Sequence, residues 1–419
     1  MVAENGAGSG RSTSSATAAS NPIMDEPHSS DATNAADVQR VADGFRRIAV
    51  AEFARDSPLY ERLSYAVADR PELLAPLLAA PVTQRRALLY FAAVAYLLRD
   101  EPRHPLAEWY PVLGGERAAA DGDPVAALAD FVDAYRDDIQ RLCATRTTQT
   151  NEVRRAALLR PAFGRAAEIA TASAGVVGSG SGGIALIELG TSGGLLLATD
   201  RYAIRYHTGD RSETYGDGDL SIDCEIRGDG WPLAAGTAVP VTTRTGVDLS
   251  PIRPGDADGA AWLHACIWPE HTDRDRRLDL ALAEVAKVGP TMIAADMRDG
   301  LAVAVDAVPP DVTPCVFASH ALIYLDARGR ADLVRMLTEI GARRDLVVVT
   351  NEAHQLHAWT DPVPHVEHDV TTLVTVVAWR GGETTVEVLS EADAHGRWLR
   401  YEPRGYPFAP PALSGASDA

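Results

Sequence analysis

The first 170 residues carry hydrophobic positions at the spacing of helices. Apolar side chains recur at intervals of three and four residues from Val41 to Phe53, from Leu88 to Tyr96 and from Leu128 to Tyr135. This is the period of a helix with one buried face. Prolines divide the region into short segments. The pattern predicts a helical N-terminal domain over residues 38–172, with no convincing strand.

After Ile184 the pattern changes to short apolar runs that alternate with amphipathic segments. We expect strands at Ile184–Leu189, Val239–Val247, Thr291–Ala295, Cys315–Ala318 and Leu346–Thr350. Strands that alternate with helices predict a parallel sheet covered by helices. The fold class expected is therefore α/β, with a Rossmann-like, mostly parallel sheet over residues 184–403 behind the helical domain.

Hairpins and irregular segments complete the expected organisation. Runs at 371–379 and 384–389 predict a C-terminal antiparallel hairpin, and the segment near 202–238 predicts an inserted hairpin. Residues 1–37 and 404–419 are expected to be disordered tails, because they have few large apolar groups to offset the entropy lost on ordering. Residues 173–183 are expected to be a Gly/Ser-rich linker.

Charge and cysteine content narrow the classes of partner. The chain has 39 basic and 58 acidic residues, a net charge of −19, so its surface repels nucleic acids and anionic membranes. We expect a small-molecule partner, and the composition leaves the oligomeric state open. The four cysteines form no C-x-x-C pair, and the chain has no apolar run of membrane-spanning length. The first residues lack a basic start and an apolar run, so we expect no signal peptide. These features are typical of a cytoplasmic protein with reduced thiols.

The segment with the strongest functional signal is Glu188-Leu-Gly-Thr-Ser-Gly-Gly194. A carboxylate at a strand end followed by a glycine-rich turn suits a cofactor, because glycines let the backbone approach a ligand. The same residues match G-x-S-x-G, the nucleophile elbow of hydrolases, with Ser192 as nucleophile and Asp296 with His320 or His354 as partners. The turn follows the first strand of its sheet, which favours the cofactor interpretation. A tight turn without a ligand is the third possibility.

The order of these features resembles that of class I S-adenosylmethionine-dependent methyltransferases. An acid precedes the glycine turn, further acids end the second and third strands, and an antiparallel hairpin closes the sheet. The resemblance implies S-adenosylmethionine as cofactor, with Asp248 at the ribose, Asp296 at the adenine, and the loop residues Glu188, Gly190, Ser192 and Gly194 around it. Asp248 lies about 58 residues after Gly190, against about 20 in a compact nucleotide-binding unit. The segment 202–238 accounts for the difference.

A second resemblance covers almost the whole chain, from about Phe45 to Tyr401. The chain is similar to a bacterial family catalogued only as a domain of unknown function. The residues that carry the resemblance are 57–60 (SPLY), 149–152 (QTNE), 188–195, 200–202 (DRY), 246–248 (GVD) with Pro251, 262–263 (WL) and 268–269 (WP). This family commonly has Ala in place of Gly193 and Asn in place of Leu196. The resemblance implies a methyltransferase-like Rossmann domain behind a helical domain.

Candidate catalytic and substrate-binding residues follow from position. His320 and Tyr324 come at or after the fourth strand, which faces the substrate in this architecture, so His320 is the candidate base. A buried, satisfied histidine is equally compatible with the sequence. Two polar segments are candidates for the substrate pocket, with a capped helix start and a surface ion pair as the alternatives: Gln149, Asn151 and Glu152, and Asp200, Arg201 and Tyr202.

A metal site is not expected. The pairs His354/His357 and His365/His368 have a spacing of three, but prolines at 362 and 364 break the helix that such a site would need. The leading hypothesis is a methyltransferase-like protein that acts on a small molecule. The alternatives are a serine hydrolase that uses Ser192 and a protein that binds a nucleotide-like ligand without catalysis.

Overall fold

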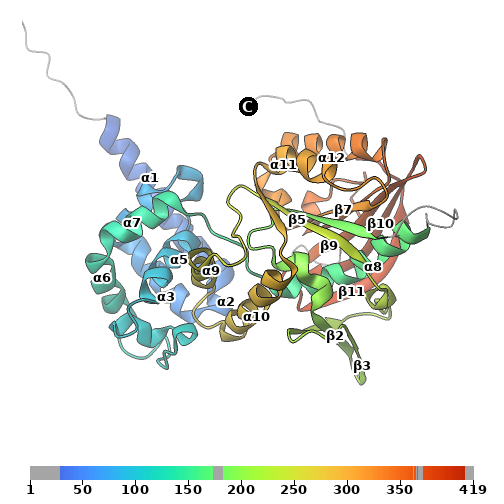
Figure 1. The fold of residues 1–419 in the computed structure, drawn as a ribbon. Helices are drawn as coiled ribbons and strands as arrows, with labels where there is room; N and C mark the ends of the chain where they lie inside the picture. The colour runs from blue at the N-terminus through green and yellow to red at the C-terminus, as the bar shows by residue number, and fades with distance from the viewer. Residues whose placement is uncertain (1–28, 173–182, 362, 365, 367–370, 411–419) are drawn as a thin grey trace, which may run out of the picture.

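The computed structural model of the chain describes residues 29–172, 183–361, 363, 364, 366 and 371–410. A helical region and an α/β region built on one large sheet lie side by side (Figure 1). This arrangement confirms the expected fold class. Most of the two expected tails and almost all of the expected linker at 173–183 lie outside the described residues.

The helical region consists of short helices around an aromatic core. Tyr60 and Phe91 stack with ring centroids 4.3 Å apart, and Phe45 and Phe53 pack edge-on against Phe91. Ser57 caps the helix that begins at Pro58. The helices are α1 (Ser29–Ile48), α2 (Ala54–Asp56), α3 (Pro58–Asp69), α4 (Pro71–Leu74), α5 (Ala87–Leu98), α6 (Pro124–Ala134) and α7 (Arg136–Thr145). A π-helical turn, η1 (Ala49–Phe53), joins α1 to α2.

The boundary between the two regions differs from the one expected at residue 172. One helix before this boundary packs on the sheet, and one helix after it packs in the helical region. Helix α8 (Ala156–Thr171) packs on the sheet, where Phe163 lies edge-on to Phe317 at 5.0 Å. Helix α9 (Ala257–Ala265) follows a strand in the chain, yet its Trp262 lies in the core of the helical region. Helix α8 is therefore buried against the sheet, and α9 is buried against the helical region.

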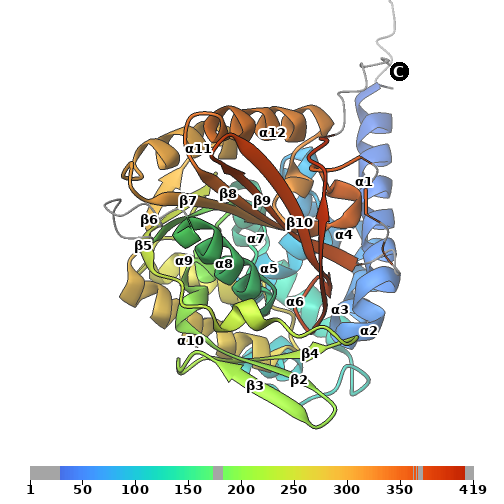
Figure 2. The same ribbon diagram turned by 90° about the vertical axis from the view of Figure 1, so that its right-hand side faces the viewer.

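The sheet has eleven strands among the described residues, in the order β3-β2-β4-β11-β10-β9-β8-β7-β1-β5-β6. Strands β6, β5, β1, β7 and β8 are parallel, and β9, β10 and β11 continue the sheet antiparallel (Figure 2). The strands are β1 (Ile184–Leu189), β2 (Ala203–Thr208), β3 (Arg211–Tyr215), β4 (Ser221–Ile226), β5 (Val241–Asp248), β6 (Thr291–Ala294), β7 (Thr313–Ser319), β8 (Leu346–Ala353), β9 (Thr371–Arg380), β10 (Glu383–Asp393) and β11 (Trp398–Tyr406).

Alternate residues of the central strands face two separate cores, as expected for a sheet covered on both faces. In β1, Leu186 packs towards α8 and α10 (Thr272–Val288), whereas Ile187 packs towards α11 (Met297–Asp306) and α12 (Ala327–Gly341). The chain moves from β1 outwards to β5 and β6 and then returns to β7 on the other side of β1. This reversal lies between β1 and β7, and the carboxyl ends of the strands beside such a reversal are where sheets of this kind commonly bind ligands.

The inserted segment departs from the expected hairpin. The hairpin joins β2 to β3, whereas β4 pairs with β2 in parallel and links it to β11. The insertion therefore extends the main sheet. The helix expected after the glycine turn is a short 3-10 helix, η8 (Leu195–Arg201), which leads directly into β2.

The ends of the described chain also differ from expectation. Helix α1 begins at Ser29, inside the segment 1–37 that was expected to be disordered. Strand β11 continues to Tyr406, past the expected end of the domain at residue 403, because it pairs with β10. The β9–β10 hairpin is confirmed, and Gly381 and Gly382 form its turn at positive φ.

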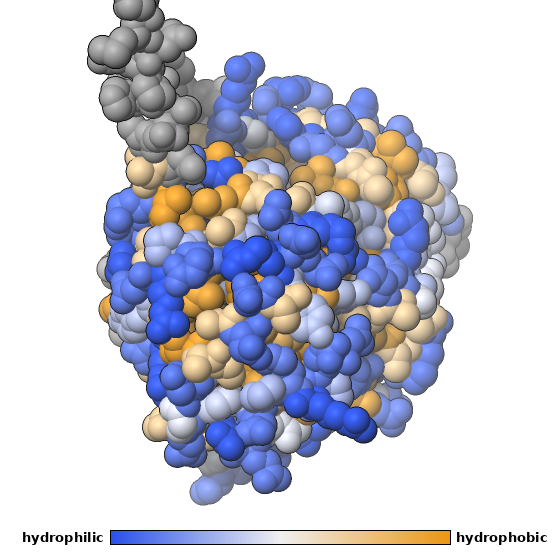
Figure 3. Space-filling model, turned by 90° about the vertical axis from the view of Figure 1, so that its left-hand side faces the viewer, coloured by the Kyte–Doolittle hydropathy of each residue, from blue (hydrophilic) through white to orange (hydrophobic). Residues whose placement is uncertain are grey.

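The surface of the helical region is mixed in character. On this face, hydrophilic residues separate small hydrophobic areas (Figure 3). None of the helices in the described ranges combines the length and apolar composition needed to cross a membrane.

Candidate functional site

The glycine-rich loop lies at the carboxyl edge of the sheet, between β1 and β5. The backbone N–H groups of Gly190 and Thr191 donate to the Val247 carbonyl at 2.8 and 3.1 Å. The N–H of Ser192 donates to the Asp248 carboxylate at 2.9 Å. These donors are therefore used to fasten the loop to β5. This differs from the expected row of free N–H groups at a helix start.

The loop glycines are required by contacts within the protein. A Cβ on Gly190, at φ 76°, would lie 2.6 Å from the Cβ of Ala321. A Cβ on Gly194, at φ 71°, would lie 2.9 Å from the Cε of Met292. Both positions combine a left-handed backbone with close packing, where only glycine fits without strain. Their close neighbours are thus protein side chains.

Glu188 is buried at the end of β1, with 3% of its surface exposed. Its carboxylate accepts a hydrogen bond from the Thr191 hydroxyl at 2.7 Å. Burial raises the pKa of Glu188 to about 8, although the Thr191 hydrogen bond opposes the shift. Glu188 therefore holds a proton near neutral pH.

The acids at the ends of β5 and β6 are more accessible. Asp248 accepts one N–H on each oxygen, from Ser192 and from Ser250, both at 2.9 Å. Each oxygen retains a lone pair. Asp296 caps α11, and its pairing with Arg298 lowers the pKa of the carboxyl. These two half-buried carboxylates lie at the ends of neighbouring strands, where the sequence predicted them.

Arg155 occupies the centre of this edge. It is 7% exposed and donates to the Ala394 carbonyl at 3.0 Å and to the Ser319 carbonyl at 3.3 Å. Burial lowers its pKa to about 10, so it remains charged at neutral pH. Its charge opposes the burial that raises the pKa of Glu188 and Glu352. Arg155 thus links β7, the β10–β11 turn and two buried carboxyls.

His320 directly follows β7, and Glu352 lies near the end of β8. Burial, reinforced by Arg155, lowers the pKa of His320 to about 3, so its ring is neutral and weakly basic. Burial raises the pKa of Glu352 to about 7, while the N–H groups of Ala321 and Leu322 donate to its Oε1. Glu352 is therefore better matched to proton transfer near neutral pH than His320.

Several buried polar atoms near this edge have no hydrogen-bond partner among the described residues. Most buried polar groups in proteins are paired, so unpaired ones call for a specific explanation. These atoms come from four segments of the chain: Asn151 Oδ1, Ser192 Oγ, His320 Nε2 and Glu352 Oε2.

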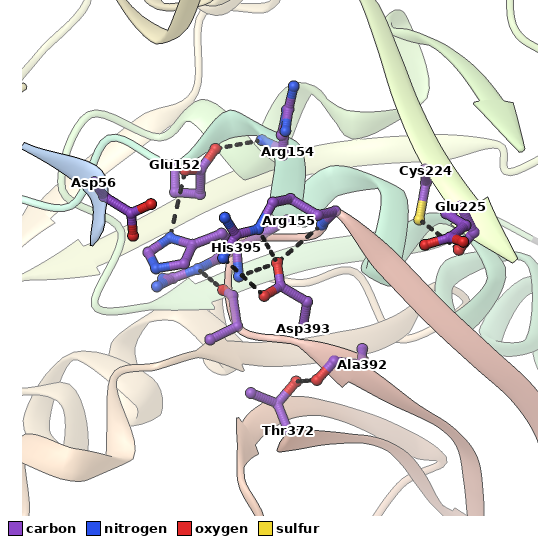
Figure 4. A network of polar contacts seen from close by, with 12 residues as sticks. Asp56, Glu152, Arg154, Arg155, Cys224, Glu225, Thr372, Ala392, Asp393 and His395 are labelled. Atoms are coloured by element: carbon purple, nitrogen blue, oxygen red, sulfur yellow. Dashed lines mark hydrogen bonds and ion pairs between the residues drawn. The ribbon is translucent and has the colours of Figure 1, made fainter. Parts of the chain in front are cut away.

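The polar segment 149–152 crosses the carboxyl edge of the sheet, and Glu152 caps the 3-10 turn that follows it. Gln149 donates to the Ser250 carbonyl at 3.5 Å, beside Asp248. Asn151 donates to the Leu263 carbonyl at 2.7 Å. Glu152 pairs with Arg274 at 3.3 Å. It also pairs with His395 at 3.5 Å (Figure 4). The segment thereby connects the end of β5 with α10 and the β10–β11 turn.

The structure places the other expected substrate residues in contacts that stabilise the fold. Asp200 pairs with Arg244 at 2.8 Å, and Arg201 lies 3.6 Å from Glu284 on α10. Tyr202 is fully buried and donates its hydroxyl to the Leu195 carbonyl. These contacts fix η8 against the sheet and α10, which leaves Tyr202 inaccessible to a substrate.

Tyr324, the second expected catalytic residue, lies at the surface near Arg155. Its side chain is 64% exposed on a 3-10 turn, η10 (Leu322–Tyr324). The turn carries the side chain outwards. Ala321, three residues earlier in the chain, packs against the glycine loop.

The hydrolase arrangement lacks its central hydrogen bond. Ser192 Oγ and His320 Nε2 are both buried, and each is without a partner among the described residues. A nucleophilic serine needs a base within hydrogen-bonding reach. Ser192 does share one feature with an elbow, a positive φ of 51°. In this loop, that conformation directs its N–H to Asp248.

The histidine pairs after β8 show no metal-binding geometry in the part of the chain that is described. His357 lies 3.0 Å from the Thr360 hydroxyl, and burial lowers its pKa to about 4. No cluster of three potential ligands occurs among the described residues. His365 and His368 lie outside them.

Sequence reasoning missed the arginines at this junction. Arg155 follows the recognised polar segment, but it resembles any residue of a capped helix start. Arg274 and Arg277 lie on α10, where an arginine-rich pattern predicts only a solvated face. Their spacing of three places both on one side of the helix. That spacing is the one signal that the sequence offered.

Comparison with known proteins gives the chain a family. No curated protein and no solved structure matches it. A family model described as "Uncharacterized protein conserved in bacteria (DUF2332)" matches residues 42–401. This match spans both the helical region and the sheet, so the chain belongs to that bacterial family.

Proposed function

We propose that the chain binds a nucleoside cofactor of the S-adenosylmethionine type and acts as a methyltransferase-like protein on a small molecule. The supporting observation is the set of acids at the ends of three adjacent parallel strands, beside the reversal of strand order. These acids are Glu188 on β1, Asp248 on β5 and Asp296 after β6.

The side chains around Asp248 suit the ribose and the purine ring of a nucleoside. Each oxygen of Asp248 accepts one N–H and can accept a ribose hydroxyl as well. Leu249 follows directly, and 75% of its surface is exposed. An exposed leucine beside this acid offers an apolar contact for a purine ring. Asp296, on the neighbouring strand, is half-buried and has an oxygen within reach of solvent.

The glycine loop contributes in a different way from the expected cradle. Its donors are directed to Val247 and Asp248, so its role in the proposal is to orient the Asp248 carboxylate. Groups that remain for the rest of the cofactor and for the acceptor lie around Arg155. S-adenosylmethionine supplies an electrophilic methyl group when bound. Glu352 is the proposed proton acceptor, because its pKa is about 7 and its Oε2 is buried without a partner among the described residues.

Binding of S-adenosylhomocysteine by the full chain tests the proposal. A ligand at a hundredfold excess over its dissociation constant stabilises a protein by about 2.7 kcal/mol, which a thermal unfolding experiment detects. We expect stabilisation of the wild type and at least tenfold weaker binding by Asp248→Asn. The control is Asp138→Asn, an exposed acid on α7 that pairs with Arg141.

The outcomes separate the competing functions. Failure of both S-adenosylmethionine and S-adenosylhomocysteine to bind at about 1 mM, where the binding free energy is only about −4 kcal/mol, contradicts the proposal. Binding that Asp248→Asn leaves unchanged contradicts the assigned site. Binding without methyl transfer to any acceptor identifies the chain as a ligand-binding protein.

A further inference from the structure

A cavity of about 250 Å³ lies where the helical region meets the α/β region. Its walls come from four separate parts of the chain: Asp56 at the end of α2, residues 152–154, the start of α10 and the β10–β11 turn. Figure 4 shows Asp56, Glu152 and His395, which all line this cavity, close to one another. We call this cavity the arginine cleft, after its four lining arginines Arg154, Arg274, Arg277 and Arg397.

The acids that line the cleft are already engaged. Asp56 pairs with Arg55, and Asp273 pairs with Arg276. Glu270 accepts the Ser57 hydroxyl at 2.5 Å and the Leu59 N–H at 3.0 Å. Contacts of this kind hold the helical region to the start of α10.

The arginines are less completely matched. Arg397 pairs with Asp393, and one nitrogen of Arg274 pairs with Glu152. Arg154 and Arg277 have no ion pair within the described part of the chain. The Nε atoms of Arg274 and Arg277 are buried and likewise lack a hydrogen-bond partner there. Two of the four arginines, Arg154 and Arg277, therefore have no salt-bridge partner within 4 Å among the described residues, while Glu152 and Asp273 attract Arg277 from further away.

The positive charges of Arg154 and Arg277 repel one another. Burial lowers the pKa of Arg277, and the nearby charge of Arg154 lowers it further. Guanidinium groups that repel one another in a partly buried cavity are stabilised when an anion binds between them. The N-terminus of α10, a helix of 17 residues, also lies at the cleft and adds positive partial charge.

We propose that the arginine cleft binds a phosphorylated small molecule, with Arg154, Arg274 and Arg277 contacting the phosphate. Arginine forms paired hydrogen bonds to phosphate oxygens, and three guanidinium groups suit a dianion. A cavity of about 250 Å³ has room for a phosphate and a few further atoms. The stacked rings of Trp268 and His271, with centroids 5.1 Å apart, form an apolar wall for those atoms.

In this proposal, Glu152 lowers the affinity of the arginine cleft for phosphate. Its carboxylate pairs with Arg274 and His395, which hold its pKa well below its usual range although burial opposes the shift. It is therefore ionised and competes with a bound phosphate for Arg274. Replacing its charge should strengthen phosphate binding, whereas replacing an arginine should weaken it. The two opposite effects distinguish a phosphate site from a general response to mutation.

The test is calorimetric titration of the full chain with inorganic phosphate and with glycerol 3-phosphate, at constant ionic strength and without a nucleoside cofactor. We expect both to bind the wild type and Arg277→Gln or Arg154→Gln to weaken binding at least tenfold. Arg277→Lys keeps the charge and should lose less. Glu152→Gln should strengthen binding by about threefold to tenfold, because a nearby negative charge is removed.

The matched control is Arg335→Gln, an exposed arginine on α12 that pairs with Glu339. It should bind phosphate as the wild type does. The proposal is overturned if phosphate does not bind, if Arg277→Gln and Arg154→Gln bind it as tightly as the control, or if acetate binds as tightly as phosphate. Circular dichroism confirms that each variant is folded; if Arg277→Gln is not, Arg154→Gln and Arg277→Lys decide the outcome. Because no nucleoside is present, the result is independent of the methyltransferase proposal.

Discussion

The glycine loop and the arginine cleft lie at the same end of the molecule and use polar groups in opposite ways. In the loop, the N–H groups of Gly190, Thr191 and Ser192 donate to β5, and the glycines pack against protein side chains. In the cleft, Arg154 and Arg277 face a cavity without an ion pair from the described residues. The loop matches a ligand-binding pattern in sequence, whereas the cleft matches none.

The difference shows what a sequence pattern specifies. A glycine-rich turn after a strand guarantees a tight backbone path, because glycine permits positive φ and close approach. It does not determine whether a ligand or a neighbouring helix makes that approach. A cavity between charged groups, by contrast, requires segments that are far apart in the chain. Residues 152–154, 271–277 and 395–397 meet only after both regions fold.

The largest expected effect comes from filling the closed loop. Gly190→Ala should lower the free energy of unfolding by about 1–2 kcal/mol for its left-handed backbone, plus about 1–3 kcal/mol for the clash with Ala321. Urea unfolding measures the change. Gly114→Ala is the matched control, since it has φ 85° and no atom within 4 Å of the added Cβ. Equal losses in the two variants would mean that the loop is open rather than packed.

Removal of Arg155 should have the next largest effect. Arg155→Met leaves the Ser319 and Ala394 carbonyls without their donor and removes a charge that opposes the raised pKa of Glu188 and Glu352. Breaking such a buried network costs about 3 kcal/mol. The same urea experiment measures it, with Arg335→Gln as the exposed control. A decrease of less than about 1 kcal/mol in the free energy of unfolding would show that Arg155 does not stabilise the carboxyl edge of the sheet and that the glycine loop does so alone.

The pH dependence of stability should respond to Glu188. Its pKa rises from the ordinary 4.5 to about 8 on folding, so the native state keeps a proton that the unfolded state releases. The wild type therefore loses stability as the pH rises from 4.5 towards 8. Glu188→Gln cannot titrate and should reduce this loss by about 3 kcal/mol between about pH 5 and about pH 7.5. Glu339→Gln, on the exposed face of α12, should leave the slope unchanged. A Glu188→Gln slope equal to that of the wild type would contradict the buried, protonated carboxyl.

The smallest effect is expected at Ser192. Its hydroxyl is buried without a partner among the described residues, so Ser192→Ala should raise the free energy of unfolding by about 1 kcal/mol, because the variant no longer buries an unpaired hydroxyl. The variant should also bind S-adenosylhomocysteine as the wild type does. Labelling of the wild-type chain by a fluorophosphonate, lost in Ser192→Ala, would instead identify an activated nucleophile and revive the hydrolase interpretation.

The sequence by itself determined the periodic parts of this protein. Helical spacing before residue 146 and short apolar runs after 184 predicted the two regions, because burial of apolar faces depends on local repeats. The same patterns predicted β1, β5, β6, β7 and β8 and the acids Glu188, Asp248 and Asp296 at their ends. These features are encoded within a few consecutive residues, so they can be recognised without knowledge of the fold.

Tertiary structure alone decided how those residues are used. It paired β4 with β2 and β11, moved α8 to the sheet and α9 to the helical core, and buried Tyr202. It also brought Arg155, His320 and Glu352 to one edge and raised the pKa of Glu352 by burial. Such outcomes depend on contacts between residues hundreds of positions apart. Burial and net local charge arise from those contacts and are not properties of a segment.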